Sequence, residues 1–511
     1  MNNSHDVWRG SFCIEVSPIP NTIVIFGASG DLTHRKLLPA LFHLYRKKLL
    51  HENSIIVGCA RTPMTDEEFK DKVTERLAGV AAKFSEEFTS FIDKVFYHTG
   101  HYDDPNTYAE LALKLCKLEK QRCPDACRVY YLSTPSNIYI DIVSLLGEAG
   151  LTHESSSGMP WRHVVIEKPF GHDLKSAEII DRQLHKTLRE SQIYRIDHYL
   201  GKETVQNIMM MRFANIIFEP IWNNHYISNV QITAAESIGV EHRAGYYEQS
   251  GLLRDMFQNH MLEMLSLVAM EAPASFEANA VRNEKLKLIQ SIRPFTPASV
   301  KNDFIRGQYG AGKVYSEDVP AYRAEENVAP ESMIETYACG RFFIDNWRWR
   351  GVPFYIRSGK RLANRTSEIA ITFKQVPHSI FNPIRPEDLS PNQLVLNIQP
   401  EEGMALSIEA KQPGPKLCMG TLTMDFKYSE VFDSTALGAY ERLLLDCMLG
   451  DQTLFIRNDI IKASWELFEP VLNAWETPGT DIPLHIYESG GQGPEQADLR
   501  FFKDGLRWRK I

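Results

Sequence analysis

Two short segments of the chain combine side chains that could hold an anion and move a proton. The first runs Arg195-Ile196-Asp197-His198-Tyr199-Leu200-Gly201-Lys202, immediately before a predicted helix. Its His198, Tyr199 and Lys202 would suit a phosphomonoester, because lysine is a good point-charge partner for phosphate. The alternative interpretation is a charged region at the N-terminus of a helix.

The second segment, Arg254-Asp255-Met256-Phe257-Gln258-Asn259-His260, lies in a predicted amphipathic helix over residues 252–270. His260 follows Phe257 by three residues, so it falls on or beside the apolar stripe and should be partly buried, where an imidazole needs partners. An aspartate such as Asp197 could orient His260 and stabilise its charged form, which makes a general base. The alternative is a histidine satisfied within the core.

The turn Gly27-Ala28-Ser29-Gly30-Asp31-Leu32 joins a predicted strand, residues 22–26, to a predicted helix, residues 37–50. Glycines at such a turn let backbone N–H groups approach a pyrophosphate at the N-terminus of a helix. The turn has two glycines and not the three of the fuller dinucleotide fingerprint, so a plain tight turn is the alternative.

The end of the second predicted strand, residues 54–58, bears on the choice of dinucleotide. The residues that follow, Cys59-Ala60-Arg61-Thr62, lack the acid that usually binds the ribose 2′-OH of NAD. Arg61 could instead pair with a 2′-phosphate through its planar guanidinium, which favours NADP over the alternative of a solvated arginine. Lys168 directly follows another predicted strand, residues 163–167, from where it could reach both cofactor and substrate.

These residues are carried by two different patterns of predicted elements. Strands at 22–26, 54–58, 129–132 and 163–167 alternate with helices, which indicates a doubly wound, Rossmann-like α/β domain over residues 21–200. Residues 201–511 are predicted to form a larger domain with a mainly antiparallel sheet and helices on one face. Its predicted strands are 229–235, 354–357, 369–373, 394–398, 405–410 and 420–426. Residues 1–20 are assigned as an N-terminal extension, and the segment from Pro478 is expected to be loop-like.

The composition limits the partners that the chain can have. Its 511 residues are 43% hydrophobic and 24% charged, and the net charge of −9 argues against a general nucleic-acid binder. We see no apolar run of about 18 residues and no targeting segment, so we expect no membrane partner and a cytoplasmic location. The eight cysteines are scattered without the spacing of a zinc site, and no metal site is predicted.

Taken together, these segments resemble the glucose-6-phosphate dehydrogenase family over nearly the whole chain. The segments that carry the resemblance are GASGDL at 27–32, GCAR at 58–61, EKPFG at 167–171, RIDHYLGKE at 195–203, GLLRDMFQNH at 251–260, GVPFYIRSGKRL at 351–362 and AYERLLLD at 439–446. The resemblance implies oxidation of glucose 6-phosphate at C1, with NADP as hydride acceptor and 6-phosphogluconolactone as product. That reaction is the first step of the oxidative pentose phosphate pathway.

The resemblance also implies a role for each matching residue. His260 would remove the proton of the C1 hydroxyl, and Asp197 would support it. The 6-phosphate would be held by His198, Tyr199 and Lys202, with Lys360 and Arg365 completing the pocket from the sheet domain, while Glu236 and Asp255 would bind sugar hydroxyls. Lys168 would bridge sugar and nicotinamide. The cofactor would contact Gly27, Ala28, Ser29, Gly30, Asp31, Leu32, Tyr139 and, through its 2′-phosphate, Arg61.

Two departures from the family pattern stand out. The run Thr33-His34-Arg35-Lys36 follows the turn, where the family often has lysines. Asn397 and Ala370 occupy strand positions where arginines would help to hold the second, structural NADP of some animal members, which leaves only Arg357. We therefore expect no structural NADP. Like other members, the chain is expected to form a homodimer or homotetramer through the sheet domain.

Two other functions remain open at this point. A related dehydrogenase with another sugar or another cofactor preference would share the Rossmann domain, but His198, Lys202, Lys360 and Arg365 favour a phosphorylated substrate. A binding or regulatory protein on the same fold could have lost the catalytic pair, whereas His260 and Asp197 are both present.

Overall fold

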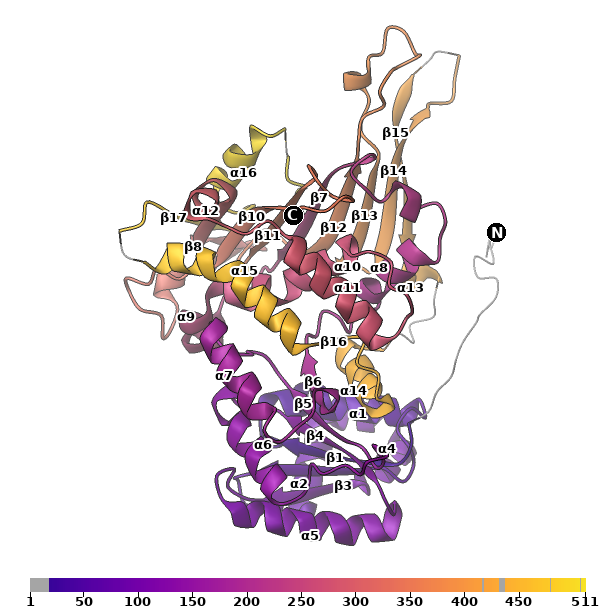
Figure 1. The fold of residues 1–511 in the computed structure, drawn as a ribbon, viewed down its shortest axis with the longest axis vertical. Helices are drawn as coiled ribbons and strands as arrows, with labels where there is room; N and C mark the ends of the chain where they lie inside the picture. Colours follow the sequence, from indigo (N-terminus) through magenta and orange to yellow (C-terminus); the bar gives the residue numbers. More distant parts are fainter. Residues whose placement is uncertain (1–17, 416–417, 432–436, 478, 506) are drawn as a thin grey trace.

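The computed structural model describes residues 18–415, 418–431, 437–477, 479–505 and 507–511, so most of the predicted N-terminal extension lies outside the described residues. Two β-sheets organise the chain, one below the other in Figure 1. The N-terminal sheet carries the dinucleotide motif, and the larger second sheet lies beyond it. None of the described helices combines the length and the apolar character that crossing a membrane requires.

The first sheet has seven strands in the order β16-β6-β5-β4-β1-β2-β3, and all of them except β16 are parallel. Their bounds are β1 Asn21–Phe26, β2 Ile55–Ala60, β3 Val95–Thr99, β4 Cys127–Leu132, β5 Arg162–Ile166, β6 Ile193–Ile196 and β16 Phe455–Ile456. β1 and β2 are buried at every residue, as expected of parallel strands covered on both faces. The predicted Rossmann-like arrangement is confirmed.

Helices connect these strands, and the order of the strands reverses between β1 and β4. The helices are α1 Leu38–Arg46, α2 Asp66–Arg76, α3 Ala78–Ala81, α4 Ser85–Ile92, α5 Pro105–Arg122, α6 Tyr139–Glu148 and α7 Leu174–Leu184. Such a reversal opens a crevice at the carboxyl ends of the two strands, where open α/β sheets bind ligands. The chain later returns to this sheet, because α14 (Ala439–Leu449) packs on α1 and β16 pairs with β6.

The second sheet is ten-stranded, with nine strands in the order β15-β14-β13-β12-β7-β11-β10-β8-β17 and β9 paired to β8. Its pairs are antiparallel except β7 with β11 and β8 with β17. The bounds are β7 Ile227–Ala235, β8 Phe304–Val314, β9 Glu317–Val319, β10 Tyr337–Phe343, β11 Pro353–Gly359, β12 Thr366–Phe373, β13 Gln393–Gln399, β14 Gly403–Lys411, β15 Met419–Lys427 and β17 Leu484–Ser489. The predicted mainly antiparallel sheet is confirmed.

One face of this sheet packs against helices that include those of the predicted site. They are α8 Glu203–Phe213, α9 Ala244–Leu252, the π-helix η6 Leu253–Met261, α10 Leu262–Ala269, α11 Ala278–Ser291, α12 Pro297–Asp303 and α15 Asn458–Glu476, and the short α13 Tyr428–Val431 follows β15. Phe342 of this face contacts Phe257 of η6 and Phe468 of α15. On the opposite face, Tyr355 packs against Phe501 of α16 (Glu495–Phe502), so the C-terminal residues cover part of that side.

The C-terminal segment is not the loop that its composition suggested. Pro478 lies outside the described residues, but the chain then forms β17 and α16. β17 joins the edge of the second sheet beside β8, with Tyr487 buried against it. The alternation of buried apolar and exposed polar residues that predicts a strand is missing from β17, because the apolar Ile486 is exposed while the polar Ser489 is buried.

Candidate active site

His260 lies in a helical segment whose geometry changes after Gly251 and again after Met261. A regular helix was predicted from residue 252 to 270, but the structure has α9, the π-helix η6 and α10 in succession. Gly251 has a φ of 63°, which glycine adopts without strain, and the Glu335 carboxylate accepts the Leu253 N–H where the new helical segment starts. π-helical turns are found frequently at functional sites.

His260 is more deeply buried than the sequence predicted, with 1% of its surface exposed. Two aromatic rings account for this burial: the Tyr199 ring stacks on the imidazole at 4.4 Å and the His198 ring meets it edge-on at 4.7 Å. Both belong to the segment after β6, so the helix carrying His260 and the end of the first sheet are in direct contact.

Asp197 and His260 form the pair that the sequence predicted. Asp197 Oδ1 is 2.5 Å from His260 Nδ1, both side chains are 1% exposed, and the same oxygen accepts the Tyr199 N–H at 2.8 Å. Burial by itself would raise the pKa of Asp197, but His260 outweighs it and the pKa lies well below its usual range. Asp197 is therefore a carboxylate fixed against one nitrogen of the imidazole.

Lys168 occupies the other nitrogen of His260. Its Nζ is 2.7 Å from His260 Nε2 and 3.0 Å from Asp255 Oδ1. A lysine ammonium can only donate, so Nε2 accepts and the ring hydrogen lies on Nδ1, facing Asp197. Burial opposes the charge of Lys168, but Asp255, Tyr246 and Asp197 together outweigh it and raise the pKa of the lysine.

The imidazole of His260 is held in its neutral form, with one nitrogen able to accept a proton. Burial lowers the pKa of His260 below 6.5, and Asp197 partly opposes this effect. The ring is therefore neutral at pH 7, with its acceptor nitrogen Nε2 toward Lys168. A buried, neutral imidazole backed by a carboxylate is the arrangement of a general base.

A second group of residues brings two cations to one uncharged acceptor. Lys202 Nζ is 2.8 Å and the Arg365 guanidinium 3.2 Å from Gln399 Oε1, and neither cation forms an ion pair within the described part of the chain. Lys202 also lies 3.8 Å from the centre of the Tyr199 ring. Burial, with a further contribution from Arg365, lowers the pKa of Lys202 to about 8. Two cations without a carboxylate partner fit a phosphate.

Glu236 and Lys360 meet at the ends of two neighbouring parallel strands. The register of β7 with β11 places Ala235 beside Gly359, so the next residues of both strands emerge together, and Glu236 Oε2 is 2.5 Å from Lys360 Nζ. Asp255, bound to Lys168, also accepts the Tyr246 hydroxyl at 3.3 Å. These carboxylates can accept hydrogen bonds from hydroxyl groups of a sugar.

The cofactor turn packs closely against the residue that follows β4, at a position where only glycine fits. Gly27 has a φ of 86°, and a Cβ at this position would lie 2.0 Å from the Ser133 carbonyl oxygen, so only glycine fits. The Gly27 and Ala28 N–H groups both donate to the Cys59 carbonyl, which fixes the turn to the end of β2. Ser29, Gly30, Asp31 and Leu32 lead directly into the π-helical turn η1 (Thr33–Leu37) and α1.

Arg61 and Tyr139 lie at opposite sides of this turn. Arg61 follows β2, is exposed and lies 5.9 Å from the centre of the Tyr102 ring, where its guanidinium is free to meet an anion. Tyr139, at the start of α6, is buried and donates its hydroxyl to the Glu167 carbonyl at 3.0 Å. Asp31 forms an exposed ion pair with Arg35. The turn and its glycine cradle thus fit a dinucleotide with a 2′-phosphate.

Three residues near these groups were not predicted. Gln399 bridges the two cations, Tyr246 binds Asp255, and Glu167 joins the cofactor side to the site through Tyr131. Gln399 and Tyr246 carried no signal, since single polar residues in strands and helices are usual. Glu167 immediately precedes Lys168, and its position at a strand end was the available signal.

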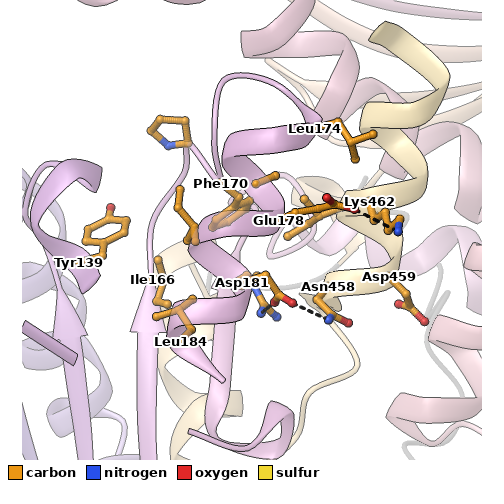
Figure 2. A pocket seen from close by; sticks show the side chains of 15 residues that line it. Tyr139, Ile166, Phe170, Leu174, Glu178, Asp181, Leu184, Asn458, Asp459 and Lys462 are labelled. Atoms are coloured by element: carbon orange, nitrogen blue, oxygen red, sulfur yellow. Dashed lines mark hydrogen bonds and ion pairs between the residues drawn. The ribbon is translucent and has the colours of Figure 1, made fainter. Parts of the chain in front are cut away.

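A separate cavity of about 160 Å³ is lined by residues of α7 and α15 together with Pro169 and Phe170. Figure 2 shows Phe170 with the side chains of these two helices around it. Its walls are mainly apolar, and the polar side chains at its edge pair with each other, Asp181 with Asn458 and Glu178 with Lys462. His260 and Lys168 are not among the residues that line it. The groups able to do chemistry therefore lie where the carboxyl ends of the first sheet meet η6, and not in this cavity.

Comparison with known proteins identifies the family. A family model described as the glucose-6-phosphate dehydrogenase NAD binding domain matches residues 24–207, and the model of the C-terminal domain of the same family matches residues 209–509. A glucose-6-phosphate 1-dehydrogenase of Aggregatibacter actinomycetemcomitans is 45% identical over 96% of this chain and 97% of that protein. The enzyme of the same name from Bacillus subtilis is 42% identical over 96% and 98%.

Solved structures agree with the sequence comparisons. A glucose-6-phosphate dehydrogenase solved in complex with its substrate glucose-6-phosphate has a TM-score of 0.88 and 37% identity, covering 97% of this chain and all of that one. A glucose-6-phosphate 1-dehydrogenase from Mycobacterium avium has a TM-score of 0.80 and 34% identity, covering 96% and 99%. The chain belongs to the glucose-6-phosphate dehydrogenase family.

Proposed function

We propose that His260 is the general base for the reaction of this family, the NADP-dependent oxidation of glucose 6-phosphate at C1. The proton of the C1 hydroxyl passes to His260 Nε2 while a hydride leaves C1, and 6-phosphogluconolactone is the product. NADP, when bound, supplies the hydride acceptor. The observation that carries the proposal is the buried chain from Lys168 through His260 to Asp197.

Asp197 stabilises the product of that proton transfer. As His260 gains a proton, its Nδ1–H already faces the Asp197 carboxylate at 2.5 Å, so the new positive charge forms beside a fixed negative one. Lys168 must give up its 2.7 Å contact with Nε2 when the substrate hydroxyl takes that place. We assign Lys168 to the sugar and the nicotinamide, which it can reach from the end of β5.

The remaining residues position the sugar. We assign the 6-phosphate to His198, Tyr199, Lys202 and Arg365, with Lys360 nearby, because two of these cations converge without a carboxylate partner. Glu236 and Asp255 bind sugar hydroxyls. Holding the remote phosphate fixes C1 against His260, which converts binding energy into orientation.

The cofactor lies along the carboxyl edge of the first sheet. We assign its pyrophosphate to the turn from Gly27 to Leu32, its 2′-phosphate to Arg61 and its nicotinamide half to the side of Lys168 and Tyr139. The close packing of Gly27 against Ser133 supports this assignment only by holding the turn in place at the end of β1.

An assay of reduced-nicotinamide absorbance tests the proposal. Glucose 6-phosphate with NADP should give rapid turnover, glucose should give little, and NAD should be a poorer acceptor than NADP. Turnover with glucose as fast as with its 6-phosphate would contradict the phosphate pocket. An absence of turnover with either dinucleotide would contradict the reaction.

We also propose that the protein is a homodimer or homotetramer in the cytoplasm. The edge strand β15 exposes Leu422 and Met424, an apolar strip suited to contact between copies through the second sheet. The seven cysteines in the described part of the chain are free thiols, which is typical of a reducing compartment. Light scattering tests the assembly, where a monomer would contradict it, and cell fractionation tests the location.

A further inference from the structure

Glu167 is a partly buried carboxyl group beside the proposed site, and we have assigned it no part in the reaction. It follows β5 and precedes Lys168. Its Oε1 accepts the Tyr131 hydroxyl at 2.5 Å, Tyr440 of α14 forms a second side-chain hydrogen bond with it, and its main-chain carbonyl accepts the Tyr139 hydroxyl. Elements from both ends of the chain therefore hold this carboxyl group in one place.

The order of the strands shows which part of a dinucleotide this carboxyl group would face. The pyrophosphate turn ends β1, and Arg61, assigned to the adenosine 2′-phosphate, follows β2 on one side of it. The other neighbour of β1 is β4, followed by β5. Since a dinucleotide extends across the carboxyl ends of the strands in both directions, its nicotinamide half lies over β4 and β5. Tyr131 and Glu167 are at those two ends.

The charge of the nicotinamide ring changes during the reaction. The ring is a cation in NADP and becomes neutral when it accepts a hydride. A buried carboxylate beside the ring stabilises the cationic form, and the same carboxylate is left without a counter-charge once the ring is neutral.

We propose that Glu167 is the counter-charge of the oxidised nicotinamide: it is held ionised when the cationic ring is bound, and it exchanges a proton with solvent, as in the free protein, once the ring becomes neutral. The inference rests on the proposed cofactor site. It gives this chain a way to favour oxidised cofactor over reduced cofactor, and so to release its product. Charge is accounted for at each stage, because the hydride removes the ring's charge and the carboxylate can then take up a proton from solvent.

The titration behaviour of Glu167 supports this role. Burial raises its pKa to about 7, although Tyr131, Lys168 and Tyr440 partly oppose the effect. It can therefore exist in either form under ordinary conditions, and a nearby cation or its loss decides which form is present.

The other ionisable groups that face Glu167 keep a constant charge near neutral pH. Burial raises the pKa values of the tyrosines, which stay neutral: Tyr131 from β4, Tyr139 from α6 and Tyr440 from α14. Lys168 keeps its positive charge because Asp255 offsets its burial and raises its pKa, and Asp197 keeps its negative charge because His260 offsets its burial and lowers its pKa. Glu167 is therefore the group in this cluster whose charge can change when the charge of the nicotinamide ring changes.

The test compares the binding of NADP and NADPH to the Glu167→Gln variant. Glutamine keeps an oxygen that can accept the Tyr131 hydroxyl, but it cannot be charged. Titrations followed by quenching of tryptophan fluorescence at pH 8, where the wild-type carboxyl is mostly ionised, should show NADP binding weakened by roughly tenfold, the size expected of one partly screened charge pair. NADPH binding should change by less than about twofold on the same reasoning, because its ring is neutral.

Tyr440→Phe is the matched control, since it removes a hydrogen bond to the same carboxyl group and keeps the charge. This variant should change the dissociation constants of NADP and NADPH by the same factor. If Glu167→Gln also weakened both nucleotides equally, Glu167 would be a structural link between β5 and α14, and the proposal would be wrong.

Calorimetry gives an independent readout. In buffers of different ionisation enthalpy, wild-type protein at pH 7 should release about half a proton more on binding NADP than on binding NADPH, and the variant should show no such difference. An equal proton count for the two nucleotides in the wild type would overturn the proposal. Wild-type protein that binds neither nucleotide would instead refute the cofactor site itself, so the two failures are distinguishable.

Discussion

Replacing Asp197 by asparagine removes one charge from the site and leaves its shape nearly unchanged. The carboxylate and the imidazole meet at 2.5 Å with both side chains 1% exposed, so their charge centres are about 4 Å apart in the protonated state. At an effective dielectric constant near 20, such a pair interacts by about 4 kcal/mol. Since about 1.4 kcal/mol corresponds to a factor of ten in rate, kcat should fall by about a thousandfold.

The dependence of kcat/KM on pH provides a second, independent test of the role of Asp197. Wild-type kcat/KM should rise with pH through a value below 6.5 and then level off, because burial lowers the pKa of His260 and the base must be neutral to act. Asp197 raises that pKa, so its loss should move the acid limb to still lower pH while the plateau falls.

The assay is steady-state NADPH formation from pH 5 to 9, with KM for glucose 6-phosphate as the control. KM should change little, because the residues assigned to the phosphate are unaltered. A plateau within tenfold of the wild type would refute the electrostatic role of Asp197, and an acid limb moved to higher pH would refute the assignment of that limb to His260.

Four other outcomes follow from the same geometry. Arg61→Ala should weaken NADP binding and leave NAD little affected, whereas an equal loss in nucleotide titrations would contradict the 2′-phosphate contact. Lys202 loses its charge as the pH rises through about 8, so kcat/KM for glucose 6-phosphate should fall above that pH while kcat is retained. The Lys202→Arg variant should not show this fall in kcat/KM. An unchanged wild-type kcat/KM between pH 7 and 9.5 would contradict the phosphate role of Lys202. Gly27→Ala should lower the melting temperature by several degrees, since a positive φ costs about 1–2 kcal/mol and the new Cβ meets Ser133; an unchanged value would contradict the close approach. Purified protein should carry at most one nucleotide per subunit, because Trp508 and Arg509 of the chain itself lie against Arg357, and a second nucleotide by absorbance would contradict this.

The sequence allowed the site residues to be placed because they follow strongly patterned elements. Lys168 and Asp197 come just after buried parallel strands, and the carboxyl ends of such strands meet at one edge. His260 could be placed on an apolar helix by its spacing. Asp197 was predicted to contact His260, 63 residues further along the chain, from the chemistry of the two side chains and from the family resemblance. The structure has that contact.

Other features depend on tertiary packing and left little trace in the sequence. β16 has two residues, too few for any periodic pattern, and becomes a strand only because β6 has a free edge. The kink at Gly251 could not be distinguished from an ordinary helical glycine, because its cause is the distant Glu335 carboxylate. Tyr440 reaches Glu167 only after the chain has returned to the first sheet.

In the proposed reaction, His260 accepts the proton of the C1 hydroxyl. The most direct test measures kcat and the dissociation constant of glucose 6-phosphate for His260→Asn, with absorbance assays and calorimetry. We expect kcat to fall by several orders of magnitude, because the buried acceptor nitrogen is lost, while the dissociation constant stays within a few-fold of the wild type. A kcat that barely changes would show that another group removes the proton.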